Sequence, residues 1–212
     1  MNSLTGLLVS WLRFVLILLL AGTARAATVA WNNPAGGAWN VAANWSPAQV
    51  PATGDTVTIT LPGTYTVTLA QNATLASLTV GAISGTQTLT FSAGTLLLQG
   101  DSAFKTNTVL NFSAGRIAVE KVTLSVAGAV NWTGGEFYGL TPTGIGRIQL
   151  ASTATLTLDG PQPKYADYVT LENRGTIIHG GAHHLYLRSD PNSNAIASVE
   201  NYGSYDLAWG SA

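Results

Sequence analysis

One short phrase recurs six times between residues 91 and 207, and it constrains the fold more than any other feature of the chain. Each copy contains a small residue that serves as an anchor for alignment, and the six anchors are Gly94, Gly115, Gly135, Ala154, Gly175 and Gly203. The spacing between successive anchors is nearly constant, except that the last step is longer than the others. A repeat of about 20 residues that varies slightly in length is typical of a solenoid, in which each repeat forms one coil of a stack.

The residues around each anchor indicate which solenoid this is. The second residue after each anchor is apolar or aromatic, and these residues are Leu96, Ile117, Phe137, Leu156, Ile177 and Tyr205. The residue between each of them and its anchor is polar. Alternation with a period of two predicts a β-strand. Two residues before each anchor stands Ser, Thr or Asn, which suits a turn and can bond to its own copy in the next coil.

These patterns predict an all-β fold, a single-stranded parallel β-helix solenoid that is right-handed like other parallel crossover connections. Helical repeats would need the periodicity of an α-helix, and none is found after Ala26. We expect the six apolar residues past the anchors to stack in a single interior file. A continuous solenoid also favours one domain over two for a chain of this length.

Residues 1–26 have the layout of a secretory signal peptide. Arg13 precedes an apolar run at residues 14–20, and the small-residue sequence Ala-Arg-Ala ends at Ala26, where we expect cleavage. The alternative, a membrane anchor, is disfavoured because Thr5, Gly6, Ser10 and Arg13 interrupt the apolar span. We therefore expect a secreted or cell-surface protein without a transmembrane segment in the mature chain.

Composition narrows the classes of partner. After the leader, seven basic and ten acidic residues remain, a formal net charge of −3, which gives no reason to expect binding to nucleic acid or to an anionic membrane. The chain has no cysteine, so disulfide scaffolds and thiolate sites are excluded. Only 9% of the residues are charged, as is common in extracellular β-sheet repeat proteins.

Residues 27–62 form a separate block that contains Trp31, Trp39 and Trp45. The open end of a solenoid needs a cover, so we predict a Trp-rich N-terminal cap followed by a first strand, with the β-helix rungs in residues 63–212. The alternative to a cap is a ligand-binding platform, in which the three indole rings are exposed and stack on sugar rings. The cap is favoured because large exposed apolar patches are uncommon.

The order Trp-Asn, Asn-Trp-Ser, Val-Pro and Gly-Asp-Thr-Val-Thr-Ile in residues 31–59, followed by Leu-Thr-Val and Gly-Thr-Leu-Leu-Leu, resembles the opening of bacterial secreted β-helix repeat proteins. These include autotransporter passenger and adhesin segments. The same stretch, up to about Gly100, is similar to the eight-glycine extracellular domain. The resemblance implies a secreted or surface protein with adhesive or ligand-binding duties, and it supplies no catalytic motif.

The candidate metal ligands are the three histidines and two glutamates. His179, His183 and His184 cluster closely along the chain, at a density at which imidazoles bind transition metals. His179 nevertheless occupies a column that is apolar in most other repeats, which favours a core histidine.

Glu172 and Glu200 share one column and should lie on adjacent rungs, about 4.8 Å apart. We expect them to stay solvated, to pair with Arg174, or to share a cation such as calcium, the one cofactor we consider. Arg116 and Glu136 should form an exposed ion pair between rungs.

Two functions are compatible with the sequence. The first is an exported, non-catalytic structural or adhesive module with a polysaccharide or another cell-surface ligand. The second is a polysaccharide lyase or hydrolase of the pectate-lyase-like class, or a fragment of one. The second is disfavoured because the six aspartates fall in unrelated columns, whereas such enzymes place several acidic residues on one face. A groove with three or more acidic or histidine side chains would favour the enzyme, and a lateral face of Thr, Ser and Asn would favour the module.

The C-terminal residues follow directly on the sixth phrase, so the sequence offers no cover for the last rung. An open sheet end templates association with other chains. We therefore expect either continuation of the chain beyond Ala212 or end-to-end self-association.

Overall fold

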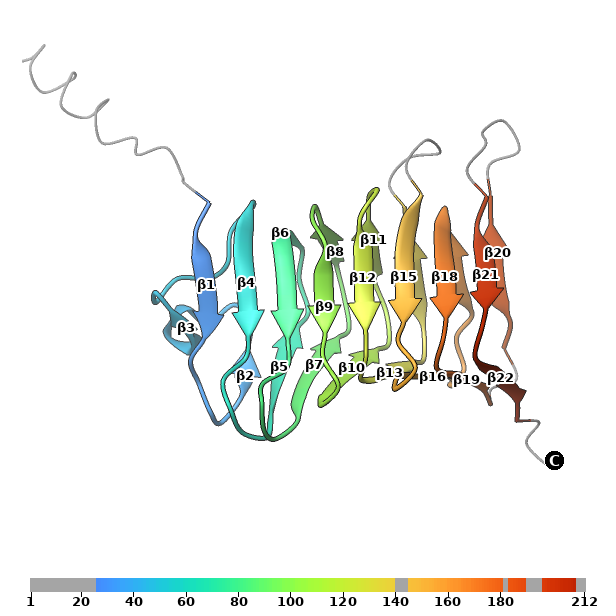
Figure 1. Ribbon diagram of the computed structural model, residues 1–212. Helices are drawn as coiled ribbons and strands as arrows, with labels where there is room; N and C mark the ends of the chain where they lie inside the picture. The colour runs from blue at the N-terminus through green and yellow to red at the C-terminus, as the bar shows by residue number, and fades with distance from the viewer. Residues whose placement is uncertain (1–25, 140–144, 181–182, 190–195, 209–212) are drawn as a thin grey trace, which may run out of the picture.

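The structure is a computed structural model that describes residues 26–139, 145–180, 183–189 and 196–208 (Figure 1). The described strands wind into a parallel β-solenoid of about six turns. The predicted all-β parallel solenoid is therefore confirmed. The predicted signal peptide lies outside the described residues, except for Ala26. No helix in the described ranges is long and apolar enough to cross a membrane.

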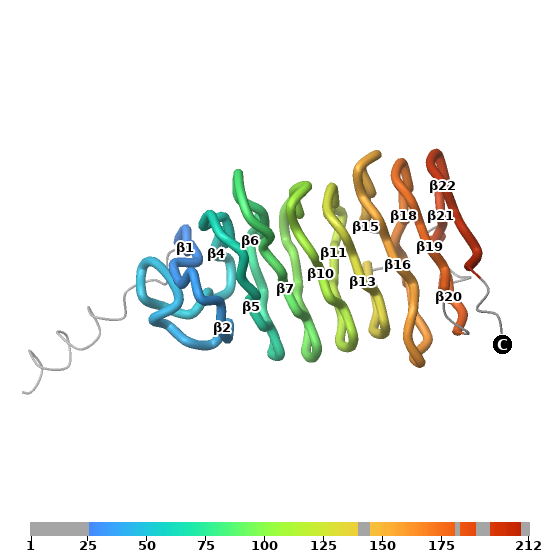
Figure 2. Tube along the Cα trace, turned by 90° about the horizontal axis from the view of Figure 1, so that it is seen from below, coloured from blue at the N-terminus to red at the C-terminus, as the bar shows by residue number. Residues whose placement is uncertain are grey.

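Each complete coil contributes one strand to each of three sides. The first side is a sheet of eight strands, which we call sheet B and which is seen from below in Figure 2. Its strands, in spatial order, are β2 (Gly37–Ala38), β5 (Tyr65–Leu69), β7 (Gln87–Phe91), β10 (Thr108–Phe112), β13 (Ala129–Trp132), β16 (Thr155–Leu158), β19 (Thr176–His179) and β22 (Ser204–Leu207).

The other two sides belong to one 14-stranded sheet, which we call sheet A. The long strand β6 (Ala73–Val80) joins them, because it pairs with β8 through Ala73 to Leu75 and with β9 through Thr79 and Val80. The second side consists of β8 (Thr95–Leu98), β11 (Arg116–Val119), β14 (Gly135–Tyr138), β17 (Lys164–Asp167) and β20 (Leu185–Arg188). The third side consists of β9 (Ser102–Phe104), β12 (Thr123–Val126), β15 (Gly146–Leu150), β18 (Val169–Asn173) and β21 (Ser198–Asn201).

The six repeated phrases do not form one file, which corrects the alignment made from the sequence. Leu96, Ile117 and Phe137 stack on the second side. Leu156 and Ile177 stack instead in sheet B, where Leu156 pairs with Val130. The first three phrases thus turn from sheet B into the second side, whereas the last three turn from the third side into sheet B. Both files enclose the same core, so the predicted architecture is unchanged. What differs is the phase of the repeat, meaning the side of the coil that each phrase forms, and it shifts between Gly135 and Ala154.

The interior is a continuous hydrophobic core in which residues of one file repeat the same kind of side chain. Phe91, Phe112 and Trp132 occupy successive rungs of sheet B, and each is fully buried. Their ring centroids lie 5.6 Å and 6.0 Å apart along the file. Because in-register parallel strands bring every residue next to its copy in the next coil, an aromatic position can extend as a stacked column.

Polar residues at the corners also bond to their copies in the next coil. Asn173 is fully buried, and its side-chain amide donates to the Asn201 side chain at 2.6 Å and to the Ser204 carbonyl at 2.8 Å. Its side-chain oxygen accepts from the Gly175 amide at 3.0 Å. This asparagine therefore has partners for both ends of its side chain, as a buried polar group requires, and the predicted bonding between copies is confirmed here.

Residues near the N-terminus extend the stack and cover its first complete coil. Strand β1 (Thr28–Trp31) pairs in parallel with β4 (Asp55–Ile59), which pairs with β6. Strand β3 (Trp45–Ser46) folds back antiparallel to β1, after a short 3-10 helix at Ala42–Asn44. Residues 27–62, which were predicted to form a cap and one strand, therefore contribute two strands, β1 and β4, to the third side.

Candidate functional site

The three tryptophans that could have formed a sugar platform are buried inside the N-terminal cap. Trp31, Trp39 and Trp45 are only 3%, 1% and 2% exposed. Trp45 packs edge-on against both others, with ring centroids 4.9 Å from Trp31 and 4.7 Å from Trp39, and its indole N–H donates to the Trp39 carbonyl at 2.7 Å. Their buried faces are not available for stacking on a pyranose ring.

The histidines lie near the C-terminal end of the solenoid without converging on a common point. His179, in β19, is half-buried, and its ring nitrogens face the Tyr205 hydroxyl at 3.1 Å and the His183 carbonyl at 2.9 Å. His183 and His184 are exposed. Within the described ranges no group of three or more His, Asp or Glu side chains is arranged to hold a metal ion.

Glu172 and Glu200 are paired on adjacent rungs of β18 and β21, as the sequence predicts. Arg147 lies beside both glutamates, which the sequence alignment did not predict. It donates to Glu172 at 2.5 Å and to Glu200 at 3.3 Å. Arg174 donates to Glu172 at 2.6 Å, so the expected pairing with Arg174 is present. Glu172 is only 5% exposed, so the expectation of a solvated carboxylate is wrong for it.

The electrostatics of this cluster follow from these contacts. The hydrogen bond from Arg174, followed by that from Gln149, lowers the pKa of Glu172 below its ordinary value. Arg147 places a positive charge beside both glutamates. The two glutamates and two arginines together are neutral, which suits an ion-pair network that ties three rungs together.

A second charged cluster lies on the outward face of the second side. Arg116 donates to Glu136 at 2.8 Å, and Arg188 donates to Glu136 at 2.9 Å and to Asp167 at 2.6 Å. The predicted pair of Arg116 and Glu136 therefore forms, but it is not an exposed pair, because Glu136 is only 9% exposed. Burial, and then the hydrogen bond with Asp167, raise the pKa of Glu136.

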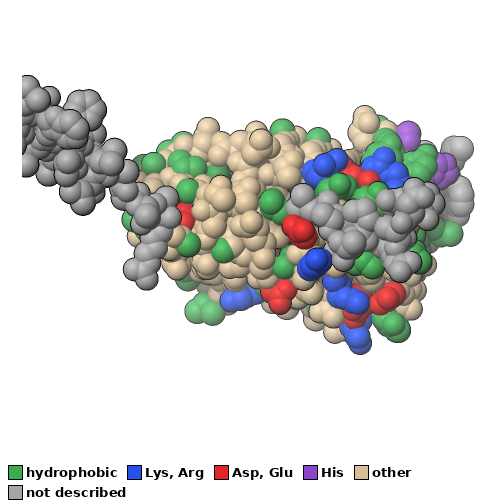
Figure 3. Space-filling view, turned by 90° about the horizontal axis from the view of Figure 1, so that it is seen from above, with side chains coloured by type: hydrophobic (Ala, Val, Ile, Leu, Met, Phe, Trp, Pro, Cys, Tyr) green, Lys and Arg blue, Asp and Glu red, His purple; other side chains and the backbone are tan. Residues whose placement is uncertain are grey.

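The guanidinium groups of this cluster also cover tyrosine rings. Arg116 lies 4.2 Å from the ring centroid of Tyr138, and Arg188 lies 4.3 Å from that of Tyr165. Charged side chains gather over the C-terminal half of the molecule in Figure 3, while the N-terminal half of that face is nearly uncharged. The two arginines of this cluster pair with carboxylates on other rungs.

The outward face of sheet B has a different character. Its outward positions form two rows that run across the strands, one through Thr66, Thr88, Val109, Ala129, Thr155 and Thr176 and the other through Thr68, Thr90, Asn111, Asn131, Thr157 and Ile178. None of these positions in β5 to β19 is charged. Asn131 donates to Asn111 at 2.9 Å across the rungs. A lateral face of this composition is the feature expected of the structural or adhesive module rather than of the enzyme.

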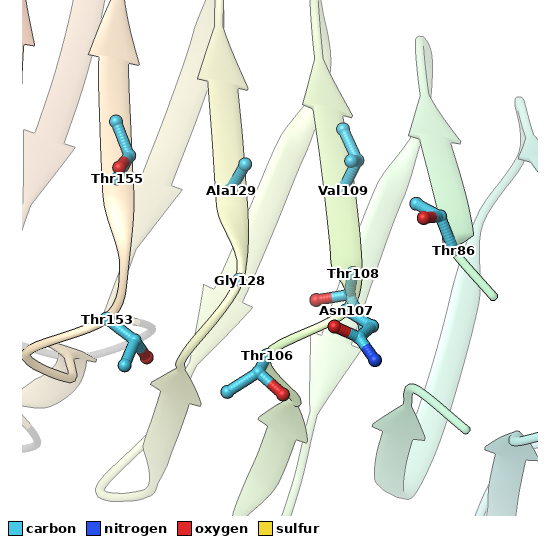
Figure 4. A pocket seen from close by; sticks show the side chains of 9 residues that line it. All are labelled: Thr86, Thr106, Asn107, Thr108, Val109, Gly128, Ala129, Thr153 and Thr155. Carbon is cyan, nitrogen blue, oxygen red and sulfur yellow. The ribbon is translucent and has the colours of Figure 1, made fainter. Parts of the chain in front are cut away.

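A groove of about 320 Å³ lies where four of these strands begin (Figure 4). It is lined by Thr86, Thr106, Asn107, Thr108, Val109, Gly128, Ala129, Thr153 and Thr155. Val109 and Ala129 supply apolar surface, and the remaining side chains supply hydroxyl and amide groups. Groups of this kind bind neutral, hydroxyl-bearing ligands.

The groove exists because the rung that starts at Gly128 has small side chains. Ala129 is the smallest residue in its row, between Val109 on one rung and Thr155 on the next. A side chain at Gly128 would meet the Thr108 carbonyl oxygen at 2.4 Å, so that position accepts only glycine without a shift of the neighbouring rung. Gly128 therefore allows the rungs to stack closely at this corner, and the small side chain of Ala129 leaves the hollow in its row.

Several polar groups in the groove are available to a ligand. Thr108 donates to the Lys105 carbonyl at 2.7 Å, and Thr153 donates to the Ala127 carbonyl at 2.9 Å, which fixes both hydroxyls. The side chains of Thr86, Asn107 and Thr155 form no hydrogen bond to any residue that the structure describes. Thr108 is only 2% exposed, so the groove offers a ligand the fixed hydroxyl of the exposed Thr153 together with others that can turn toward it.

Comparisons with protein-family models, with curated proteins and with solved structures found no match for the chain. The class that the fold defines is a parallel β-solenoid.

Sequence reasoning missed the groove, because aligning all six phrases in one file hides which residues share a row of sheet B. The usable signal was the outward column Thr88, Val109, Ala129 and Thr155. It becomes visible only when residues 155–158 are aligned with residues 129–132 rather than with residues 136–139.

Proposed function

We propose that the protein is an exported structural and adhesive module that binds polysaccharide on the outward face of sheet B. The observation on which this proposal rests is the uncharged face of Thr and Asn side chains with a groove above Ala129. Export is supported by the signal-peptide layout of the segment that ends at Ala26, and an exported chain is either secreted or held at the cell surface.

The chemistry of the face suits a neutral sugar chain. Threonine offers a hydroxyl that donates and accepts and a methyl group that contacts the apolar face of a sugar ring. Because β-branched side chains on a strand have restricted χ1 rotation, little conformational entropy is lost when a ligand immobilises them. Uncharged ligands also avoid the desolvation cost that a charged ligand incurs without a charged partner.

The acidic residues give the enzyme alternative less support. Glu136, Asp167 and Glu172 are each engaged by arginine. Glu136 and Asp167 lie on the second side, so they belong to a different side of the coil from the groove. The proposal therefore assigns these carboxylates to the stability of the stack.

The test is binding of the purified chain to neutral and acidic polysaccharides, with release of reducing ends followed in parallel. Ala129→Arg places a long side chain in the groove and should weaken binding at least about tenfold, the effect of losing about one or two hydrogen bonds. Ala103→Arg is the matched control, because Ala103 is an equally half-buried outward alanine on β9, on the third side.

Equal binding by both arginine variants would show that the groove is not the site. Release of reducing ends by the parent chain would replace the module with an enzyme. A thermal unfolding curve for each variant would establish that both remain folded, since each substitution is made at an outward position.

A further inference from the structure

We infer that the groove on sheet B takes an extended, neutral chain of equatorially linked sugars lying along the solenoid axis, with about one sugar per rung. This inference rests on the proposed function and specifies its ligand class. It follows from the direction of the groove, the spacing of its lining residues and the absence of charge among them.

The direction of the groove follows from which strands line it. Its walls come from the starts of β7, β10, β13 and β16, which are neighbours in sheet B, so the groove crosses the strands and runs along the axis (Figure 4). Thr86 lies at one end and Thr155 at the other, with Val109 and Ala129 between them. A ligand that contacts all four must therefore be extended along the axis.

The spacing of the rungs selects the kind of chain. Neighbouring strands lie about 4.8 Å apart. In a β-1,4-linked chain of glucose, mannose or xylose the equatorial bonds extend the polymer, and each sugar advances the chain by close to the length of one ring. Successive sugars can then lie over successive rungs, with neighbouring sugars turned relative to one another so that each presents hydroxyl groups to the threonine and asparagine side chains. An α-1,4-linked chain curls, so its successive sugars leave the line of the groove.

The charge of the lining selects against uronates. The nine lining residues include no charged side chain. A carboxylate placed there would lose hydration without gaining an arginine or lysine partner. The arginines of the second and third sides are engaged by carboxylates on those sides. Binding should therefore depend little on ionic strength.

The experiment measures the affinity of the full chain for cello-oligosaccharides of two to six sugars, beside malto-oligosaccharides of equal length. The inference predicts that affinity rises with each sugar up to about four, the number of rungs that line the groove, and then levels off. It also predicts that the α-linked series binds at least about tenfold more weakly, the effect of about one or two lost hydrogen bonds.

A single-atom change tests the far end of the groove. Thr155→Val removes a hydroxyl and keeps the shape of the side chain, so it should weaken binding of the four-sugar chain about fivefold, the effect of one hydrogen bond. Thr157→Val is the control, because Thr157 is the next outward residue of the same strand and does not line the groove. It should leave the affinity unchanged.

The outcomes separate the inference from the proposed function. Affinity that does not grow beyond two sugars, a preference for the α-linked series, or equal loss in both valine variants would overturn the inference. In that case the proposed function survives if Ala129→Arg still weakens binding to polysaccharide. If no polysaccharide binds at all, the inference and the proposed function are both wrong.

Discussion

At the scale of single residues, the outward charges of this solenoid are arranged in networks between rungs. Glu172 illustrates the arrangement, because it is only 5% exposed and accepts hydrogen bonds from Arg174 at 2.6 Å and from Arg147 at 2.5 Å. Removing one member of such a buried network leaves the others without partners, which costs more than the exposed ion pair that an alignment alone suggests.

Glu172→Gln should therefore make the free energy of unfolding less dependent on pH in the acidic range. The pKa of Glu172 is lowered in the folded state, so its contribution is fully present above the ordinary value of 4.5 and is lost as the pH falls through the folded-state value. We expect the parent chain to exceed the variant in unfolding free energy by about 1–3 kcal/mol at pH 7.

The measurement is urea unfolding of both proteins at pH 7 and at a series of acidic values. The difference between them should shrink below pH 4.5 as the glutamate becomes protonated. A difference that is the same at every pH would mean that the ionised form of Glu172 contributes nothing. Glu200→Gln is a useful comparison, because Glu200 is more exposed, with a side chain 40% accessible, and should have a smaller effect.

At the scale of elements, the N-terminal cap is held together by packing between aromatic rings. Trp31, Trp39 and Trp45 form a cluster beside Tyr65, whose ring stacks on Trp31 with centroids 6.4 Å apart. The Tyr65 hydroxyl donates to the Leu61 carbonyl at 3.0 Å, and burial raises its pKa to about 12. The cap thus extends the core into the block that precedes the regular coils.

Trp45→Ala should destabilise the chain by about 3–5 kcal/mol, because it removes a buried indole and leaves a cavity. The substitution also removes the hydrogen bond to the Trp39 carbonyl. Unfolding in denaturant followed by circular dichroism measures the change. Val41→Ala serves as the control, since Val41 is 44% exposed in the same block and should cost less than about 1 kcal/mol. Equal losses in the two variants would contradict the covering role of Trp45.

At the scale of the whole molecule, neutral and charged surfaces are separated. Sheet B presents uncharged Thr and Asn rows, whereas sheet A has the ion-pair networks of its C-terminal half. The networks join neighbouring rungs along the second and third sides, and the outward rows of sheet B from β5 to β19 contain no charged residue. One stack of coils therefore combines flanks with paired charges and one neutral face.

The sequence was sufficient to predict the solenoid, because in-register stacking repeats one pattern of apolar and polar residues in every coil. It also predicted that Glu172 lies beside Glu200 and that Arg116 lies beside Glu136. These positions follow from local spacing within stretches of constant period.

The phase of the repeat could not be predicted in the same way. The phrase around Ala154 follows the same pattern as the phrase around Gly135, a small anchor followed by a polar and then an apolar residue, although it folds onto Val130 and Trp132. Both corners of the coil use a small residue followed by an alternating strand, so local physics does not distinguish them. The contacts of Arg147 and Arg188 were missed for the same reason, since their partners depend on the correct phase.

Cysteine cross-linking tests the phase most directly, because the native chain contains no cysteine. Disulfides form when the two Cα atoms lie within about 4.4–6.8 Å, and neighbouring strands are about 4.8 Å apart. In the structure Asn131 is the partner of Thr157, whereas alignment of the phrases would pair Thr157 with Tyr138. Oxidation should close a disulfide in Asn131→Cys/Thr157→Cys and leave free thiols in Tyr138→Cys/Thr157→Cys. The opposite result would contradict the stacking that places Ala129 in the groove of sheet B.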